Sequence, residues 1–238
     1  MPFLAITSAL ALAATSPFSA PALPGADTIT VGHKSLRGHT PRLGVDTTEI
    51  FMERDGKRQM ISTGIESVSK TADGILVVFY GQSRNGVSID SVTISPATLA
   101  PIRHVEAFTG QQATYTFNGG KLTGTSKDST GEHATDKTID AGRFDFSVVQ
   151  QVTNALPLTA GYAATILAYD VAQHKERSVG YTVVSQDHLT WHGGDVAAWK
   201  TVMDLGTHQV TRWIDARTRR DLQWEINAPN MHMIGVTK

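Results

Sequence analysis

Nine histidines are the first residues of this chain to suggest chemistry, because imidazole is a common metal ligand. His188 and His192 are four residues apart, and Asp195 follows them closely. In a β-strand, residues i and i+4 share a face but lie about 13 Å apart, which is too far to bind one ion. No Glu follows His188, so the metalloprotease signature is absent. The sequence therefore predicts no metal site and no cofactor, and it favours solvent-facing histidines here.

Two further histidines stand near carboxylates in the sequence. His104 is two residues from Glu106, and His174 is four residues from Asp170. Metal sites in proteins usually have three or four protein ligands, and neither pair has a third one nearby. A hydrolase that uses histidines and carboxylates brought together by folding stays open as an alternative.

The motifs of nucleophilic catalysis are weak or missing. The chain has no cysteine, which excludes a thiol nucleophile, disulfides and thiolate metal sites, and it has no Gly-x-Ser-x-Gly motif. Ser67 and Lys70 match the Ser-x-x-Lys spacing of penicillin-binding enzymes, but they fall in a strand-like segment and the companion Lys-Thr-Gly is missing. The sequence therefore favours a protein that is not an enzyme.

A basic cluster at Arg217, Arg219 and Arg220 is the one group suited to an anion. Asp215 and Asp221 flank it, so we expect these charges to be neutralised within a turn. The whole chain carries 21 basic and 22 acidic residues, a formal net charge of −1. This balance argues against nucleic acid or an anionic membrane surface as a partner.

All four tryptophans lie in the C-terminal third of the chain. Tryptophans of a β-protein mostly pack in the core or at its rim. Indole rings at the mouth of a curved sheet can also line an apolar pocket. The candidate ligand-binding residues are therefore Trp191, Trp199, Trp213 and Trp224.

Repeated turn signals predict the elements that must position these residues. Gly, Asn and Asp tolerate the positive φ that tight hairpins need, so such turns between short β-prone runs indicate antiparallel strands. The turn signals are Asp55-Gly56, Asp73-Gly74, Asn85-Gly86, Asn118-Gly119-Gly120 and Gly193-Gly194.

Hydrophobic periodicity refines this picture. The apolar run Ile75 to Tyr80 predicts a central strand buried on both faces, and a phase slip between Asp90 and Val92 predicts a β-bulge. Residues 144–156 have helical spacing of apolar residues, and Pro157 ends the helix. We predict a mostly β fold, with an antiparallel, strongly curved sheet or half-barrel and one central helix against its concave side.

The N-terminal residues are typical of a removable leader. Residues 1–22 contain a short apolar stretch and end on Ala20-Pro21-Ala22, with small residues where signal peptidase cleaves. Residues 23–45 are rich in Pro and Gly and predict a flexible arm, and 46–238 predict a single β-rich domain. No later segment is long and apolar enough to cross a membrane. We expect an exported protein located in the periplasm.

Three short motifs, in this order and spacing, resemble a known family. They are Thr98-Leu99-Ala100-Pro101, Leu156-Pro157-Leu158 followed by Gly161, and Trp213-Ile214-Asp215 followed by Thr218-Arg219-Arg220. From about Ile75 to Lys238 the chain resembles the uncharacterised exported bacterial proteins of domain-of-unknown-function family 3108. The resemblance implies a curved antiparallel domain in the bacterial envelope, distantly similar to half-barrels that carry lipoproteins, and it supplies no catalytic residues.

These observations favour a non-catalytic exported module that holds an apolar small molecule or a segment of an envelope protein on its concave face. A structural or interaction domain with a solid core is the second hypothesis, and the envelope hydrolase is the third. Whether the inner side of the sheet is hollow or filled distinguishes the first two.

Overall fold

Strands dominate the structure, a computed structural model that describes residues 26–36, 40–84, 86–228 and 231–238. The strands are β1 (Asp27–Ile29), β2 (Gly44–Arg54), β3 (Lys57–Thr71), β4 (Gly74–Ser83), β5 (Gly86–Ile94), β6 (Pro101–Phe108), β7 (Gln111–Asn118), β8 (Lys121–Asp128), β9 (Gly131–Thr138), β10 (Phe144–Asp145), β11 (Ala163–Asp170), β12 (Lys175–Trp191), β13 (Gly194–Asp204), β14 (Gln209–Asp215), β15 (Asp221–Ala228) and β16 (Met231–Thr237). The helices are η2 (Lys34–Leu36), η3 (Phe146–Val148) and α2 (Val149–Ala155).

Tight turns join successive strands where the sequence predicts them. Asp55 and Gly56 have φ values of 51° and 71° and connect the paired residues Arg54 and Lys57. Gly119 and Gly120, both at positive φ, connect β7 to β8 in the same way. The turn residue Asn85 lies outside the described residues. The predicted antiparallel hairpins are thus confirmed at these turns.

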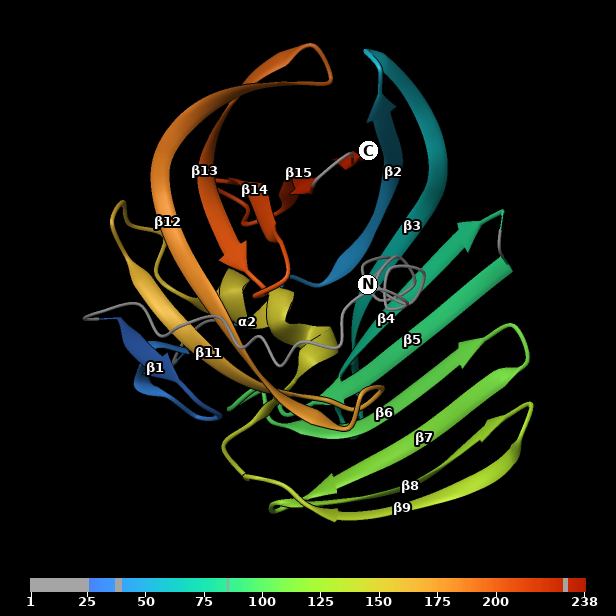
Figure 1. Cartoon of the computed structure of the whole chain (residues 1–238). Coiled ribbons are helices and arrows are strands. Elements are labelled where there is room, and N and C mark those ends of the chain that lie inside the picture. The colour runs from blue at the N-terminus through green and yellow to red at the C-terminus, as the bar shows by residue number, and fades with distance from the viewer. Residues whose placement is uncertain (1–25, 37–39, 85, 229–230) are drawn as a thin grey trace.

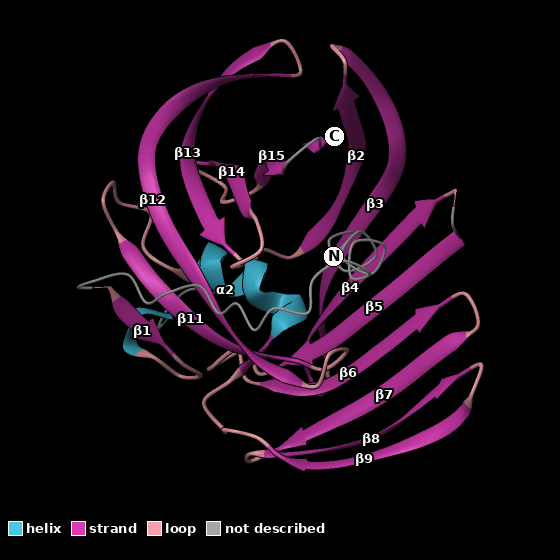
Figure 2. Cartoon of the chain, viewed as in Figure 1, coloured by secondary structure: helices cyan, strands magenta, loops and turns pink. Residues whose placement is uncertain are grey.

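One 16-stranded sheet contains both halves of the chain. Its order is β1-β11-β12-β13-β14-β15-β16-β2-β3-β4-β5-β6-β7-β8-β9, with β10 beside β11. The pairing of β16 with β2 joins the halves, and the path is not closed between β1 and β9. The sheet curves strongly around α2 (Figure 1), and strands account for most of the described chain (Figure 2).

The sheet is mixed, so the prediction of a purely antiparallel sheet needs correction. β1 and β10 both pair with β11 in parallel. A long stretch of chain, rather than a tight hairpin, separates each of these strands from β11. A parallel pair needs such a connection. The consecutive strands β2 to β9 and β11 to β16 pair antiparallel.

The central helix is shorter than the periodicity of residues 144–156 predicts. Phe144 and Asp145 form the short strand β10, and the Asp145 carboxylate accepts a hydrogen bond from Ser147 N at 2.8 Å at the start of η3. Only 149–155 is α-helical, and Leu156 before the proline is extended. Strand pairing and the N-cap thus take the first residues of the pattern away from the helix.

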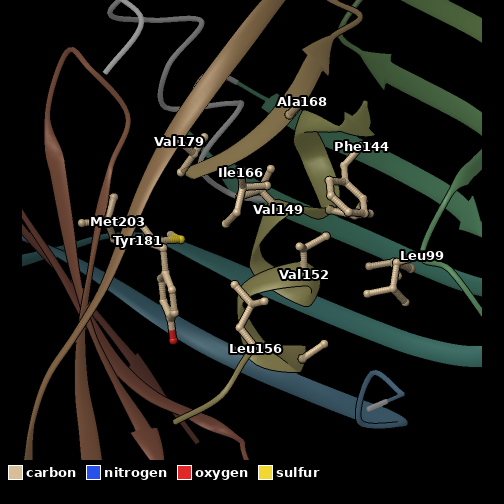
Figure 3. Packing of buried hydrophobic residues seen from close by; sticks show 14 of the residues in the cluster. Leu99, Phe144, Val149, Val152, Leu156, Ile166, Ala168, Val179, Tyr181 and Met203 are labelled. Atoms are coloured by element: carbon tan, nitrogen blue, oxygen red, sulfur yellow. The ribbon is translucent and has the colours of Figure 1, made fainter. Parts of the chain in front are cut away.

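The helix packs on the concave side of the sheet. Val149 and Val152 of α2, and Leu156 directly after it, belong to the main cluster of buried residues. Figure 3 shows them facing side chains of β11 and β12, among them Ile166 and Tyr181. The apolar stripe of the helix is therefore buried against the curved sheet, as the amphipathic spacing predicts.

Two strand predictions fail in an informative way. On β4, Ile75, Val77 and Phe79 are buried, whereas the residues between them are only partly buried, so a single face of the strand is fully covered. No bulge interrupts the β4–β5 pairing, whereas the β5–β6 register shifts between Thr93 and Ile94, after the predicted position. The alternation of apolar and polar residues changes phase in the sequence because the charged Asp90 lies on the same buried face as Val92.

Part of segment 23–45 is docked, although the sequence predicts a flexible arm. β1 pairs with β11, and Ile29 and Leu36 are 0% and 4% exposed in the main buried cluster. Apolar burial and backbone pairing hold this stretch against the sheet. The predicted leader, 1–22, lies outside the described residues. None of the helices that the structure describes is long and apolar enough to cross a membrane.

Candidate functional site

The register of β5 to β9 aligns one row of side chains across five strands. Asp90 is opposite Glu106, Glu106 opposite Ala113, Ala113 opposite Ser126, and Ser126 opposite His133. Directly opposite residues share a face of the sheet. Since Asp90 and Ala113 are buried, this face is the inner one. The row therefore places two carboxylates beside two small side chains.

The neighbouring row on this face is closely packed. Its members are Val92, His104, Tyr115, Gly124 and Thr135. A Cβ atom at Gly124 would lie 2.9 Å from Tyr115 Cδ1 and 2.1 Å from the carbonyl oxygen of Thr114. Only glycine fits beneath this part of Tyr115, whose ring lies edge-on to His104 at 6.2 Å between centroids.

His104 is fully buried among carboxylates. Its Nδ1 lies 2.7 Å from Asp145 Oδ2, and its Nε2 lies 3.2 Å from Asp90 Oδ1 and 3.8 Å from Glu106 Oε2. Ser147 Oγ donates to Asp90 Oδ2 at 2.8 Å. These contacts connect β5, β6, β10 and η3 at one point behind the row.

The carboxylates determine the charge of His104. Burial alone lowers the pKa of this imidazole, but Asp145 and Asp90 outweigh it and raise the pKa to about 10. His104 is therefore a cation at neutral pH, and a general base needs a free nitrogen near that pH. Ser147 donates to Asp90 rather than to His104, so the group is a buried ion-pair cluster and not a nucleophile with its base.

A cleft of about 800 Å³ opens in front of this cluster. Its floor is the aligned row, where Ala113 and Ser126 leave space beside Glu106. The β11–β12 turn and the β13–β14 turn form the opposite wall, which includes His174 and His208. The volume is within the range of small-molecule sites, about 300–1,000 Å³.

The cleft also has apolar walls. Phe108 lines it and is 38% exposed. Phe146 and Leu205 contribute from the other side. Large exposed apolar side chains beside a concavity are typical of binding surfaces. The cleft thus offers an apolar lining over a charged floor.

The four candidate tryptophans do not line this cleft. Trp224 is buried in the main cluster, and Trp199 packs against that cluster. Trp213 lies under a lysine ammonium of β13 at 5.7 Å from its ring centroid, and Trp191 donates to a backbone carbonyl of β16 at 2.9 Å. A ligand-binding role for these indoles stays a prediction.

His188 lies on β12 and His192 lies in the turn that follows it, and each has a different partner. His188 Nδ1 lies 2.7 Å from Asp195 Oδ2, but both side chains are about 70% exposed and outside the cleft. His192 Nε2 lies 3.2 Å from a backbone carbonyl of β16. Among the residues that the structure describes, no three His, Cys, Asp or Glu side chains are placed to hold a metal ion.

The arginine cluster has structural partners. Arg219 Nη1 donates to the carbonyl oxygens of Asn154 and Leu156 at 2.6 and 2.9 Å, where α2 ends. Arg220 Nε donates to Asp46 at 2.7 Å. A cation at a helix C-terminus satisfies the last carbonyls and the helix dipole. The partners of these two arginines thus lie outside the turn, whereas the sequence predicts neutralisation by Asp215 and Asp221 within it.

The sequence does not predict the cluster around His104, because Glu106 is the only one of its partners that lies near it in the sequence. Its closest partner, Asp145, lies 41 residues away. One local signal existed, because Asp90 breaks the apolar alternation of β5 on the buried face. A charged residue at a core position marks either a bulge or a buried polar site.

A family model described as "Protein of unknown function (DUF3108)" matches residues 52–227. The chain belongs to this family. The match confirms the resemblance seen in the sequence, and it extends further towards the N-terminus than those motifs. No curated protein matches this DUF3108 chain.

Two solved structures are similar to the DUF3108 chain at low sequence identity. A β-barrel-like protein of domain of unknown function DUF1849 from Brucella abortus has a TM-score of 0.49 and 10% identity, covering 83% of this chain and 97% of its own. The hypothetical lipoprotein YmcC from Escherichia coli (K12) has a TM-score of 0.34 and 12% identity, covering 80% and 86%.

Proposed function

We propose that this DUF3108 protein is an exported, non-catalytic module that binds a small, largely apolar molecule in the cleft over β5–β8. The observation that carries the proposal is the cleft itself, about 800 Å³ with apolar walls on the inner face of the sheet. α2 packs on the concave side next to the cleft, and the space over Ala113 and Ser126 is where we place the ligand. The buried ion pairs behind it supply a rigid floor rather than acid–base chemistry.

Titration with N-phenyl-1-naphthylamine, an uncharged dye whose emission rises in apolar surroundings, tests this role. We expect saturable binding at one site. Ser126→Leu places a larger side chain in the floor and weakens binding at least tenfold, while Thr125→Leu does not, because Thr125 is exposed on the opposite face of β8. Binding that is absent, or unchanged by Ser126→Leu, contradicts the proposed site.

The tryptophans provide an independent check on where the ligand binds. Because none of them lines the cleft, a non-fluorescent ligand bound there leaves the tryptophan emission maximum unchanged. A ligand that binds on Trp191, Trp199, Trp213 or Trp224 shifts that maximum as the indoles lose water. A shift that saturates together with binding therefore favours the tryptophan site over the cleft.

The leader pattern of residues 1–22 supports the proposed export. When the chain is expressed in a bacterium, we expect to find it in the periplasmic fraction. We also expect its first residue to be Leu23, which the mass of the intact protein measures. Ala22→Arg removes the small residue before the cleavage site and blocks processing. An intact N-terminus in the cytoplasmic fraction contradicts export.

A structural or interaction domain is the second candidate. The observation that favours it is the packing of α2 into the concave side, which leaves much of the interior solid. This role becomes the better account if no dye saturates the cleft and the protein still folds normally.

A further inference from the structure

Some charged side chains that line the cleft have a partner of opposite charge or a hydrogen-bond donor, and others do not. Those without one are candidate contacts for the ligand that the proposed function requires. Arg177 donates to Asp170 Oδ2 from Nε at 3.2 Å and from Nη2 at 3.1 Å. Asp128 accepts hydrogen bonds from the backbone and side chain of Thr130 at 2.7 and 2.6 Å. Arg177 and Asp170 thus pair with each other, and Thr130 engages one oxygen of Asp128, Oδ1.

The histidines of the opposite wall add no positive charge at neutral pH. Burial lowers the pKa of His174 below its ordinary value, and Lys137 lowers it further. Burial also lowers the pKa of His208. Both imidazoles are neutral at pH 7, so neither offers a charge to a ligand.

Asp90 and Glu106 of the floor, together with the His104 cluster behind them, include more carboxylates than cations. His104 is the one cation that faces Asp90, Glu106 and Asp145 within 4 Å in the described part of the chain. Asp90 is 6% exposed, and its buried Oδ1 accepts no hydrogen bond. Glu106 Oε2 lies 3.8 Å from His104 Nε2, beyond hydrogen-bond distance, and its side chain is 29% exposed. Glu106 thus borders the cleft as a carboxylate without a donor.

We propose that the ligand of the cleft carries a protonated amine that pairs with Glu106, with its apolar part against Phe108 and Phe146. Charge-assisted hydrogen bonds to carboxylates are among the stronger polar contacts. Burial raises the pKa of Glu106, His104 opposes this rise, and Asp90 and Asp145 add to it, so an ammonium supplies the missing counter-charge. The inference deepens the proposed function and depends on it.

Two probes that differ only in head charge test the inference. Dansylcadaverine has an apolar fluorophore on a five-carbon primary amine, and its N-acetylated form is neutral. We expect the amine to bind wild-type protein with a Kd about tenfold lower than that of the acetylated probe. Glu106→Gln removes this preference by weakening amine binding. Glu132→Gln, at an exposed position of β9, is the matched control and retains it.

The outcomes separate the two proposals. Equal affinity of both probes for wild-type protein overturns the amine assignment and leaves the binding role intact, provided that the uncharged dye still saturates the cleft. A preference that persists in Glu106→Gln also overturns the assignment to this residue. No binding of either probe or of the dye overturns both proposals. Equal affinity in the wild-type protein overturns the amine assignment without any variant, so this arm of the test does not depend on a variant folding.

Discussion

His104 is a cation enclosed by carboxylates, and it makes the stability of the fold depend on pH. Its pKa is about 10 in the folded chain and 6.5 in a free peptide, so the stabilisation is fully present below pH 6.5 and is lost as pH rises towards 10. Between pH 7 and 9 we expect this group to lower the free energy of unfolding by about 1.4 kcal/mol per pH unit. Urea unfolding at pH 7, 8 and 9 measures the slope.

Asp145→Asn separates the contribution of His104 from that of other groups that titrate. The substitution removes the nearest negative charge, so the pKa of His104 falls towards its ordinary value and the slope above pH 7 becomes shallower. The variant also loses about 3 kcal/mol at pH 7, because it breaks a buried ion pair. Identical slopes in variant and wild type would show that His104 is not the group responsible.

The residues of this cluster show what the sequence reveals about the site and what it hides. Asp90 disturbs the alternation of its strand, and that disturbance is visible in the sequence. Asp145 lies in a segment with helical periodicity, and nothing local indicates that it caps η3 and faces β6. A contact between residues far apart depends on the register of several strands, which a single sequence does not specify.

At the scale of elements, Arg212 connects α2 to the sheet. It is 1% exposed, donates to both oxygens of Asp221, and reaches Thr153 Oγ1 and Asn154 Oδ1 at 2.6 Å. Arg212→Ala leaves these partners without their donor, and we expect a loss of about 3 kcal/mol in the free energy of unfolding. Arg217→Ala, at an exposed position of the following turn, serves as the control and changes it by less than about 0.5 kcal/mol. Equal effects would contradict the role of Arg212.

β16 packs against β15 through a glycine. A Cβ atom at Gly235 would lie 2.0 Å from Cε2 of Trp224, so Gly235→Ala displaces a buried indole. We expect a loss of about 1–3 kcal/mol in urea unfolding, together with a red shift of tryptophan emission. Gly194→Ala is the control, because its nearest neighbour would be 3.6 Å away and its φ is not positive. An unshifted spectrum in Gly235→Ala would contradict the displacement.

Local signals predict the hairpins better than they predict the helix. Asp55-Gly56 and Gly119-Gly120 form turns because few other residues adopt their φ values, and this constraint is local. The helical pattern of residues 144–156 is also local, but β11 recruits Phe144 and Asp145 as strand neighbours from outside the segment. Tertiary pairing overrides periodicity there.

At the scale of the whole molecule, the pairing of β16 with β2 makes the two halves one sheet. Gly235 is opposite Ile50, which is 0% exposed in the main buried cluster. That cluster includes residues of β4 and β5 as well as of α2, β11 and β12. Neither half has a core of its own, so the halves are expected to unfold together.

The positions of the tryptophans make this cooperativity measurable. All four lie on β12 to β15, so their fluorescence reports the C-terminal half, while far-ultraviolet circular dichroism reports strands throughout. For one cooperative domain over residues 46–238, the two signals follow the same urea transition with the same midpoint. Two separated transitions would show instead that β2 to β9 fold apart from β11 to β16. In that case, the main buried cluster would couple the two halves less strongly than its burial implies.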